Sequence, residues 1–237
     1  MKIHLLTPFP KMTDAIIHES ILGRAEKKEI VKYEIHNLFD FADSPHYRID
    51  DYPFGGSSGM VMKPEPVFRA FEKAKESLDH TIPIRVIYPT PDGKILNQKI
   101  SEELATESQM VFINGHYKGI DQRIRDNLVT DEISIGDYIL TGGELASMVI
   151  LDSIVRLIPG VINRKESADT DSFSHPLLDG PYYTRPEVYE GMETPKILLS
   201  GHHQKVREWM MKKREEKTRE RRPDLWKKYI SSTENTE

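Results

Sequence analysis

The feature that most constrains the fold is an alternation of short apolar runs with helical patterns. It extends through the first two thirds of the chain. Four runs are typical of strands: MKIHLLT (residues 1–7), IVKYEIHNL (30–38), IPIRVIYPT (82–90) and QMVFINGH (109–116). Between them, helical patterns cover residues 14–29, 66–78 and 100–107, the first with apolar side chains at Ile16, Ile17, Ile21 and Leu22. Because strands that alternate with helices favour parallel pairing, the sequence predicts an α/β domain with a mostly parallel sheet.

The composition changes after Pro159, and this change predicts three segments. Residues 1–160 form the α/β domain in this interpretation. Residues 161–175 are mostly polar and predict an interdomain linker that becomes ordered when a ligand binds. Residues 176–237 predict a small helical domain, with a basic helical stretch from about Lys196 onward.

Charge is distributed unevenly along the chain. The net charge is −5, yet residues 201–230 contain eleven Lys and Arg against five Asp and Glu. A basic segment at the end of an otherwise acidic chain predicts a surface for nucleic acid. A solvated, charge-rich helix would have a similar composition, so this signal needs support from motifs.

The types of residue that are missing also narrow the possible functions. The sequence contains no cysteine, which excludes disulfides, thiolate metal sites and a cysteine nucleophile. No apolar run has the roughly 20 residues needed to cross a bilayer. The N-terminal MKIHLLTPFP has no apolar signal-peptide core with a cleavage site. We therefore expect a soluble, cytoplasmic protein without a membrane partner.

Three loops that adjoin strand-like runs are candidates for a ligand site. They cover residues 88–90, 114–119 and 136–143 and are rich in glycine and aromatic residues. In open α/β sheets, ligands bind beyond the carboxyl ends of the strands, where glycine lets the backbone approach a ring. Each loop alone fits an ordinary turn, but three together favour a ligand. No G-x-G-x-x-G follows the first strand, which argues against a conventional dinucleotide site.

Residues 133–186 hold the densest set of candidate functional residues. A β-rich run leads through a Gly-Gly turn into a long apolar helix that ends near Arg156, and a polar stretch then leads to Asp171. Taken singly, Arg156 fits a cation at a helix C-terminus, and Asp171 fits a helix N-cap or a solvated loop acid. Their proximity to a glycine-rich turn is more typical of an active site.

Three further motifs leave their roles open. The segment LLDGPYYTRP (177–186) fits either contact with RNA or a rigid bracket that anchors the second domain. The loop DDYPFGGSSGM (50–60) fits either close contact with a flat ring or a flexible hairpin tip. The adjacent His202 and His203 point to different sides of a helix, so we expect a helix start or an RNA contact and no metal site.

Six motifs in combination connect the chain to a known family. They are GDYILTGGELA (136–146), RLIPG (156–160), DSF (171–173), LLD (177–179), YTRP (183–186) and SGHH (200–203). They resemble those of the bacterial tRNA (guanine-N1)-methyltransferases, the TrmD family of the SPOUT superfamily, and the resemblance extends to about Tyr229. It implies a deep trefoil knot built from the three loops and a homodimer whose active site is shared between subunits. It also implies methyl transfer from S-adenosylmethionine to N1 of the guanine 3′ of the anticodon in tRNA.

The resemblance assigns roles to individual residues. Asp171 matches the base that removes the N1 proton, and Arg156 matches the arginine that stabilises negative charge at O6. Whether Asp171 or a water accepts the proton is left open. Cofactor contacts are implied for Tyr88, Pro89, Gly115, Tyr117, Gly119, Ser134, Ile135, Gly136, Asp137, Tyr138, Ile139, Leu140, Gly142 and Gly143. Substrate contacts are implied for Asp51, Gly59, Ser172, Asp179, Arg185 and His202.

Lys118 departs from the family pattern, because many relatives have at this position a glutamate that has been linked to the cofactor and magnesium. A lysine cannot ligate magnesium, so the sequence assigns no metal ligand and leaves the magnesium requirement open.

The sequence leaves two rival functions to be tested. A related SPOUT enzyme could methylate another RNA atom, such as a ribose hydroxyl, but it would have less use for a base at Asp171. A non-catalytic RNA-binding protein of this fold would have no affinity for S-adenosylmethionine.

Overall fold

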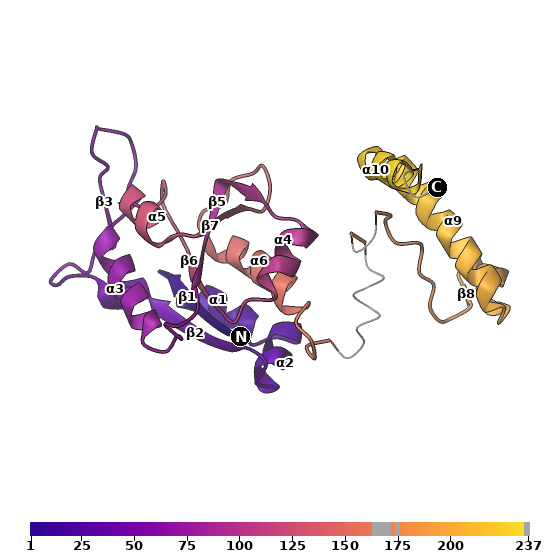
Figure 1. The fold of residues 1–237 in the computed structure, drawn as a ribbon, viewed down its shortest axis with the longest axis horizontal. Helices are drawn as coiled ribbons and strands as arrows, with labels where there is room; N and C mark the ends of the chain where they lie inside the picture. Colours follow the sequence, from indigo (N-terminus) through magenta and orange to yellow (C-terminus); the bar gives the residue numbers. More distant parts are fainter. Residues whose placement is uncertain (163–171, 174–175, 235–237) are drawn as a thin grey trace. The chain divides into compact units, whose positions relative to one another are not determined.

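The computed structural model describes residues 1–162, 172–173 and 176–234, which fall into two compact units, Met1–Asn163 and Arg164–Glu237 (Figure 1). Each unit is described by itself. The first contains β1 (Lys2–Thr7), α1 (Pro10–Ile17), α2 (Ser20–Lys27), β2 (Lys32–Asn37), the 3-10 turn η1 (Leu38–Phe41), β3 (Asp50–Asp51), β4 (Val61–Met62), α3 (Pro64–Lys75), β5 (Arg85–Ile95), α4 (Gln98–Leu104), β6 (Gln109–Ile113), α5 (Gln122–Leu128), β7 (Asp131–Ser134) and α6 (Glu144–Val155).

A five-stranded sheet in the order β2-β1-β6-β5-β7 forms the centre of the first unit. All of its described strand pairs are parallel, which confirms the prediction of an α/β fold with a mostly parallel sheet. Every residue of β6 is buried, as expected for a central strand that is covered on both faces. Strands β3 and β4 pair separately as a small antiparallel hairpin.

Helices cover both faces of this sheet. Ile3 and Leu5 of β1 pack into a core that also contains residues of α1, α2, α4 and α6. Leu6 packs into a second core, on the opposite face, with residues of α3, α5 and η1. This division follows from the alternation of side chains along a strand. Figure 1 shows α3 and α5 on one side of the sheet and α4 and α6 on the other.

Two local predictions were wrong. The helical pattern of residues 14–29 forms two helices, α1 and α2, because Ser20 has a φ of 50°, which a continuous helix excludes. The break lets Ile17 and Leu22 enter one core, although they would face different sides of a single helix. Residues 88–90, expected in a loop, lie inside β5, which continues to Ile95 through an irregularity after Pro89.

The described residues of the second unit form a hairpin and three helices. Strands β8 (Val188–Tyr189) and β9 (Met192–Glu193) pair antiparallel, and the helical pattern expected from Lys196 onward corresponds to α8 (Lys196–Leu199), α9 (His203–Arg221) and α10 (Pro223–Glu234). The segment before β8 is attached to α9, where Thr218 Oγ1 accepts a hydrogen bond from the Leu178 amide at 2.9 Å. None of the described helices is long and apolar enough to cross a membrane.

Candidate cofactor pocket and active-site residues

A pocket of about 380 Å³ opens beside residues 88–91 within β5 and beyond the carboxyl ends of β6 and β7, a volume in the usual range for a small-molecule ligand. Three parts of the chain that are distant in sequence meet there. Its walls are formed by Tyr88, Pro89, Thr90, Pro91, Gly115, His116, Tyr117, Lys118, Gly119, Ile133, Ser134, Ile135, Gly136, Tyr138, Ile139, Leu140, Thr141, Gly142, Gly143 and Ala146. All residues predicted to contact the cofactor except Asp137 are among them.

The ring of Tyr88 is a fixed part of this wall. The guanidinium of Arg125 lies over the ring, 5.6 Å from its centroid. Arg125 is itself held by Glu132 and Asp92, each with an N–O distance of 2.7 Å. Hydrogen bonds to these carboxylates raise the pKa of Arg125, and burial raises the pKa of Tyr88. A Cβ on Gly115 would lie 2.9 Å from Tyr88 Cε2, so only glycine fits beside the ring.

Two of the expected loops meet backbone to backbone at the start of α6. The Gly143 amide donates a hydrogen bond to the Gly115 carbonyl at 2.8 Å. A Cβ on Gly143 would lie 3.0 Å from the Gly115 nitrogen and 3.1 Å from Asn114 Cα. Glycine at position 143 therefore allows the chain after β7 to reach the chain after β6.

Buried polar groups lie directly behind this contact. Glu144, which is 2 % exposed, accepts a hydrogen bond from the Thr7 hydroxyl at 2.8 Å. Ser147 donates to Asn114 Oδ1 at 2.5 Å. Asn114 Nδ2 and His116 Nδ1 are buried and have no hydrogen-bond partner in the described part of the chain. Because buried polar atoms are rarely left without a partner, these two atoms mark a place where a ligand or water fits.

Sequence reasoning missed several of these residues. His116, Lys118 and Thr141 line the pocket but were not predicted to bind the cofactor. His116 and Thr141 lie inside loops that the sequence had already singled out, so position in the loop was the available signal. No sequence signal indicated the contacts Thr7–Glu144 and Asn114–Ser147, because they join residues that are far apart in sequence.

Magnesium does not fit the wall of this pocket. Of the described residues that line it, none carries a carboxylate, and Lys118 is the only one with a permanent positive charge. Magnesium requires oxygen ligands, usually including a carboxylate, and a nearby ammonium opposes its binding. No chemical step is therefore assigned to this metal.

The β3–β4 hairpin, which carries the predicted substrate residues Asp51 and Gly59, adjoins the pocket. The Lys118 amide donates to the Met60 carbonyl at 3.0 Å. A Cβ on Gly59 would lie 2.9 Å from Lys118 Cγ, and Gly59 has a φ of 96°, so a side chain there would be strained and crowded. The hairpin is thus tied to the pocket loop through Lys118.

The remaining predicted residues fall in separate places. Arg156, half-buried, forms the C-cap of α6 in the first unit. Asp171 lies outside the described residues, so its distance from Arg156 is not defined. In the second unit, the Asp179 amide donates to Ser172 Oγ at 3.0 Å, and these two residues are therefore neighbours. Arg185 and His202 are exposed, and His202 is the N-cap of α9.

Fold and pocket together define an α/β protein with a pocket of small-ligand size at one edge of a parallel sheet. Its family follows from comparison with known proteins. The chain belongs to the family described as tRNA (Guanine-1)-methyltransferase TrmD, whose sequence model matches residues 1–228.

Curated relatives agree with this assignment. The chain is 50% identical over 229 residues to proteins named tRNA (guanine-N(1)-)-methyltransferase from Anoxybacillus flavithermus and Listeria monocytogenes, which covers 97% of this chain and 93% of each relative. It is also 50% identical over 234 residues to a protein of that name from Brevibacillus brevis, which covers 99% of this chain and 95% of the relative.

Proposed function

We propose that this protein is a tRNA (guanine-N1)-methyltransferase that uses S-adenosylmethionine and modifies the guanine 3′ of the anticodon. The observation that carries the proposal is that the family match spans residues 1–228 and that the motif at residues 136–146, with residues 88–91 and 115–119, lines one pocket. Because tRNA is the substrate, we expect the protein in the cytoplasm.

The chemistry of the pocket suits S-adenosylmethionine. Glycines 115, 142 and 143 expose backbone groups to an adenine and ribose, and the side chains of Ile133, Leu140 and Tyr88 offer apolar surface to the adenine ring. Lys118 supplies a positive charge on the same wall, which fits the carboxylate of the methionine part. When bound, the cofactor supplies a methyl group on a sulfonium.

Catalysis is assigned to Asp171 and Arg156 by their match to the family motifs. The Asp171 carboxylate accepts the proton that leaves guanine N1 as the new N1–carbon bond forms and the sulfur–carbon bond breaks. The Arg156 guanidinium stabilises the negative charge that develops on O6. In this proposal the guanine lies between the pocket and the β3–β4 hairpin, with Asp51 and Gly59 beside it.

The active form is proposed to be a homodimer with a shared site. Exposed apolar side chains gather where α1 meets the start of α6, since Phe9, Met12 and Leu145 line a common hollow. Val149 lies one helical turn after Leu145 and is 49% exposed. Apolar residues of this size, grouped on one surface, favour an interface. The partner's Ser172 and Asp179 would then complete the site.

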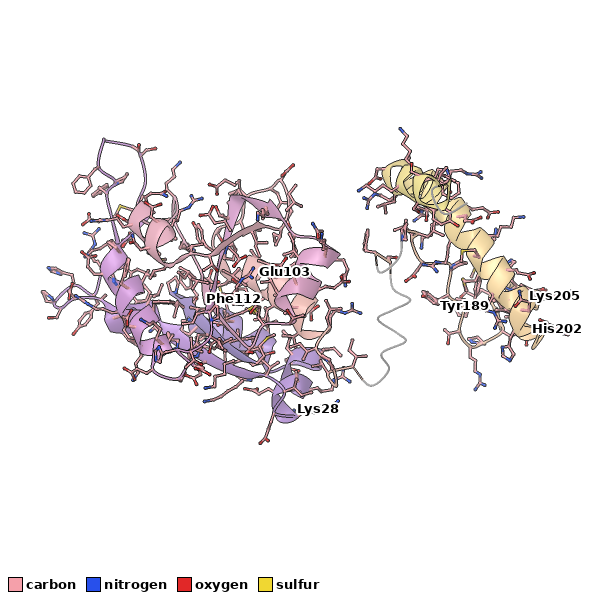
Figure 2. All side chains as sticks on the ribbon, viewed as in Figure 1. Lys28, Glu103, Phe112, Tyr189, His202 and Lys205 are labelled. Carbon is pink, nitrogen blue, oxygen red and sulfur yellow. The ribbon has the colours of Figure 1, made fainter. Side chains whose placement is uncertain are left out.

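Two further features belong to this proposal. Residues 1–160 form the knotted domain, in which the contact of Gly143 with Gly115 supports the close threading that a trefoil requires. Residues 161–175 form the linker, and residues 176–237 form the tRNA-binding domain. Figure 2 labels Tyr189, His202 and Lys205 in the second unit, where all three are exposed and able to contact an RNA backbone or base together with Arg185.

Methyl transfer from labelled S-adenosylmethionine to unmodified tRNA transcripts tests the function. We expect label in a transcript with guanine 3′ of the anticodon and none when adenine replaces it. Asp171→Asn should abolish transfer while S-adenosylmethionine still binds. Asp126→Asn removes an exposed acid of α5 and should behave as wild type.

The possible outcomes separate the rival functions. Equal label in both transcripts would exclude the guanine assignment and favour methylation of a ribose hydroxyl. Binding of tRNA without any methyl transfer or S-adenosylmethionine affinity would favour a non-catalytic RNA-binding protein.

A further inference from the structure

A cluster of two histidines and a glutamate lies on the sheet, away from the cofactor pocket. His4 belongs to β1, and Glu34 and His36 belong to the edge strand β2. The potential ligand atoms of the three side chains all lie within 4.8 Å of one another. The pocket is formed by β5, β6 and β7, whereas this cluster lies at the β1–β2 edge of the same sheet.

Strand register explains why the three side chains converge. His4 pairs with Glu34 across the parallel β1–β2 ladder, and His36 follows Glu34 by two residues. Side chains two apart on a strand share a face, and the residue opposite on the next strand shares it too. The backbone of these two strands therefore directs three ligand-type side chains to one point.

Hydrogen bonds allow the tautomer of His4 that zinc binding needs. When Ser77 donates its hydroxyl proton to the Ala74 carbonyl at 3.3 Å, its oxygen accepts from His4 Nε2 at 3.1 Å. His4 Nε2 then carries the proton, and His4 Nδ1 presents a lone pair to His36 Nε2, 2.9 Å away. Metal-binding histidines are commonly oriented in this way, by a hydrogen bond from the second ring nitrogen.

The carboxylate of Glu34 is divided between two partners. Its Oε1 pairs with Lys32 Nζ at 2.8 Å, whereas its Oε2 faces His4 Nδ1 at 3.8 Å. A cation could bind through Oε2 while Oε1 keeps its ion pair with Lys32, although repulsion from that ammonium lowers the affinity. Around a tetrahedral zinc with bonds of about 2.0–2.1 Å, ligand atoms are roughly 3.3 Å apart. The separations of 2.9 and 3.8 Å lie within about 0.5 Å of that value, and all three ligand atoms lie within 4.8 Å of one another, so side-chain rotations would bring them to zinc distance.

Both rings are suited to act as neutral ligands. Burial lowers the pKa of His4 to about 4, and burial also lowers the pKa of His36. At neutral pH neither ring has to lose a net proton, since His36 only moves its proton from Nε2 to Nδ1. The Glu34 side chain is 30% exposed, which leaves a route for the ion and room for a water ligand.

We propose that His4, Glu34 and His36 form a binding site for zinc, which cross-links β2 to β1 at the edge of the sheet. Two imidazoles and one carboxylate are a common zinc ligand set when the fourth position holds water. Without zinc, the His36 Nε2–H donates to His4 Nδ1, so the cluster is also satisfied as a hydrogen-bonded pair.

Calorimetric titration of the tag-free, metal-stripped full chain with zinc chloride tests this site. We expect one zinc per chain, and we expect zinc to raise the melting temperature of the wild type. Glu34→Gln and His36→Gln should each weaken binding by more than tenfold. Ser77→Ala, which removes only the orienting hydrogen bond, should weaken it by roughly 10-fold. His46→Gln removes an exposed histidine and should leave binding unchanged.

The proposal is overturned if wild-type protein shows neither heat of binding nor a zinc-dependent melting shift. It is also overturned if Glu34→Gln and His36→Gln bind zinc as tightly as His46→Gln, because the ion would then lie elsewhere. Cobalt provides an independent measurement on the unaltered chain, since its visible absorption bands distinguish bound from hydrated ion. Failure to perturb those bands would likewise count against the site.

Discussion

Replacing Thr7 by Val tests whether the buried Thr7–Glu144 contact holds α6 against β1. The Thr7 hydroxyl donates to the Glu144 carboxylate at 2.8 Å and accepts from the Phe9 amide at 2.9 Å. Thr7 is fully buried and Glu144 is 2% exposed. Valine has nearly the same shape and keeps the β-branch, so the substitution leaves no cavity and removes only the hydroxyl.

The expected cost follows from the two lost hydrogen bonds. A bond to a charged acceptor contributes about 1.5–3 kcal/mol, and an orphaned amide costs about 1–3 kcal/mol when it is buried. Phe9 is 39% exposed, so water can partly replace the hydrogen bond of its amide. We therefore use the lower value, about 1 kcal/mol, for the orphaned amide. The sum is about 2.5–4 kcal/mol. For a chain of this size that corresponds to a fall in melting temperature of about 5–16 °C.

Thr7→Ser is the matched control. It keeps the hydroxyl and loses one methyl group, which costs about 1 kcal/mol. Thermal and urea unfolding of the three proteins, followed by circular dichroism, gives the comparison. If Thr7→Val were as stable as Thr7→Ser, the buried hydroxyl would not stabilise the contact and the reasoning would be wrong.

Two other predictions concern charge. In steady-state assays, Lys118→Met should raise the KM for S-adenosylmethionine about fivefold with little change in kcat, because an ion pair worth about 1 kcal/mol is lost at a partly exposed site. Lys118→Arg keeps the charge and should have little effect. Added EDTA should also have little effect, because no magnesium site is assigned to the pocket. The pKa of His4 is about 4 in the folded state, below its ordinary value of 6.5. Between these values only the unfolded chain binds the proton, so stability should fall as pH drops from 6.5 to 4, by up to about 3 kcal/mol. In EDTA, His4→Gln should lose this part of the pH dependence of urea unfolding; an unchanged profile would contradict the assignment.

The central strands were predictable because each is a short apolar run that is buried on two faces. The run 109–116, for example, became the fully buried β6. The helical pattern of residues 14–29 was ambiguous, because it specifies which residues are apolar but not where the backbone turns. Helix α5 and the β8–β9 hairpin were not predicted, since their short segments contain too few periodic residues to stand out. The β3–β4 hairpin corresponds to one of the two alternatives given for residues 50–60, a hairpin tip.

The candidate site was predictable only as a set of motifs. Glycine at position 143 could be recognised as part of a turn, but its function is to contact Gly115, which lies in another loop. Sequence likewise suggested that Tyr88 faces a ligand, while the Arg125 that covers its ring came from a helix that was not predicted. Asp171 remains a prediction from its motif.

The sequence by itself determined the α/β architecture and the family, because apolar periodicity and short motifs are local features that can be recognised without knowledge of the fold. Only the tertiary structure decided which residues meet: Thr7 with Glu144, Asn114 with Ser147, and His4 with Glu34 and His36. Such contacts depend on strand order and register. These are set when the whole sheet and its helices exclude water together, and no single segment encodes them.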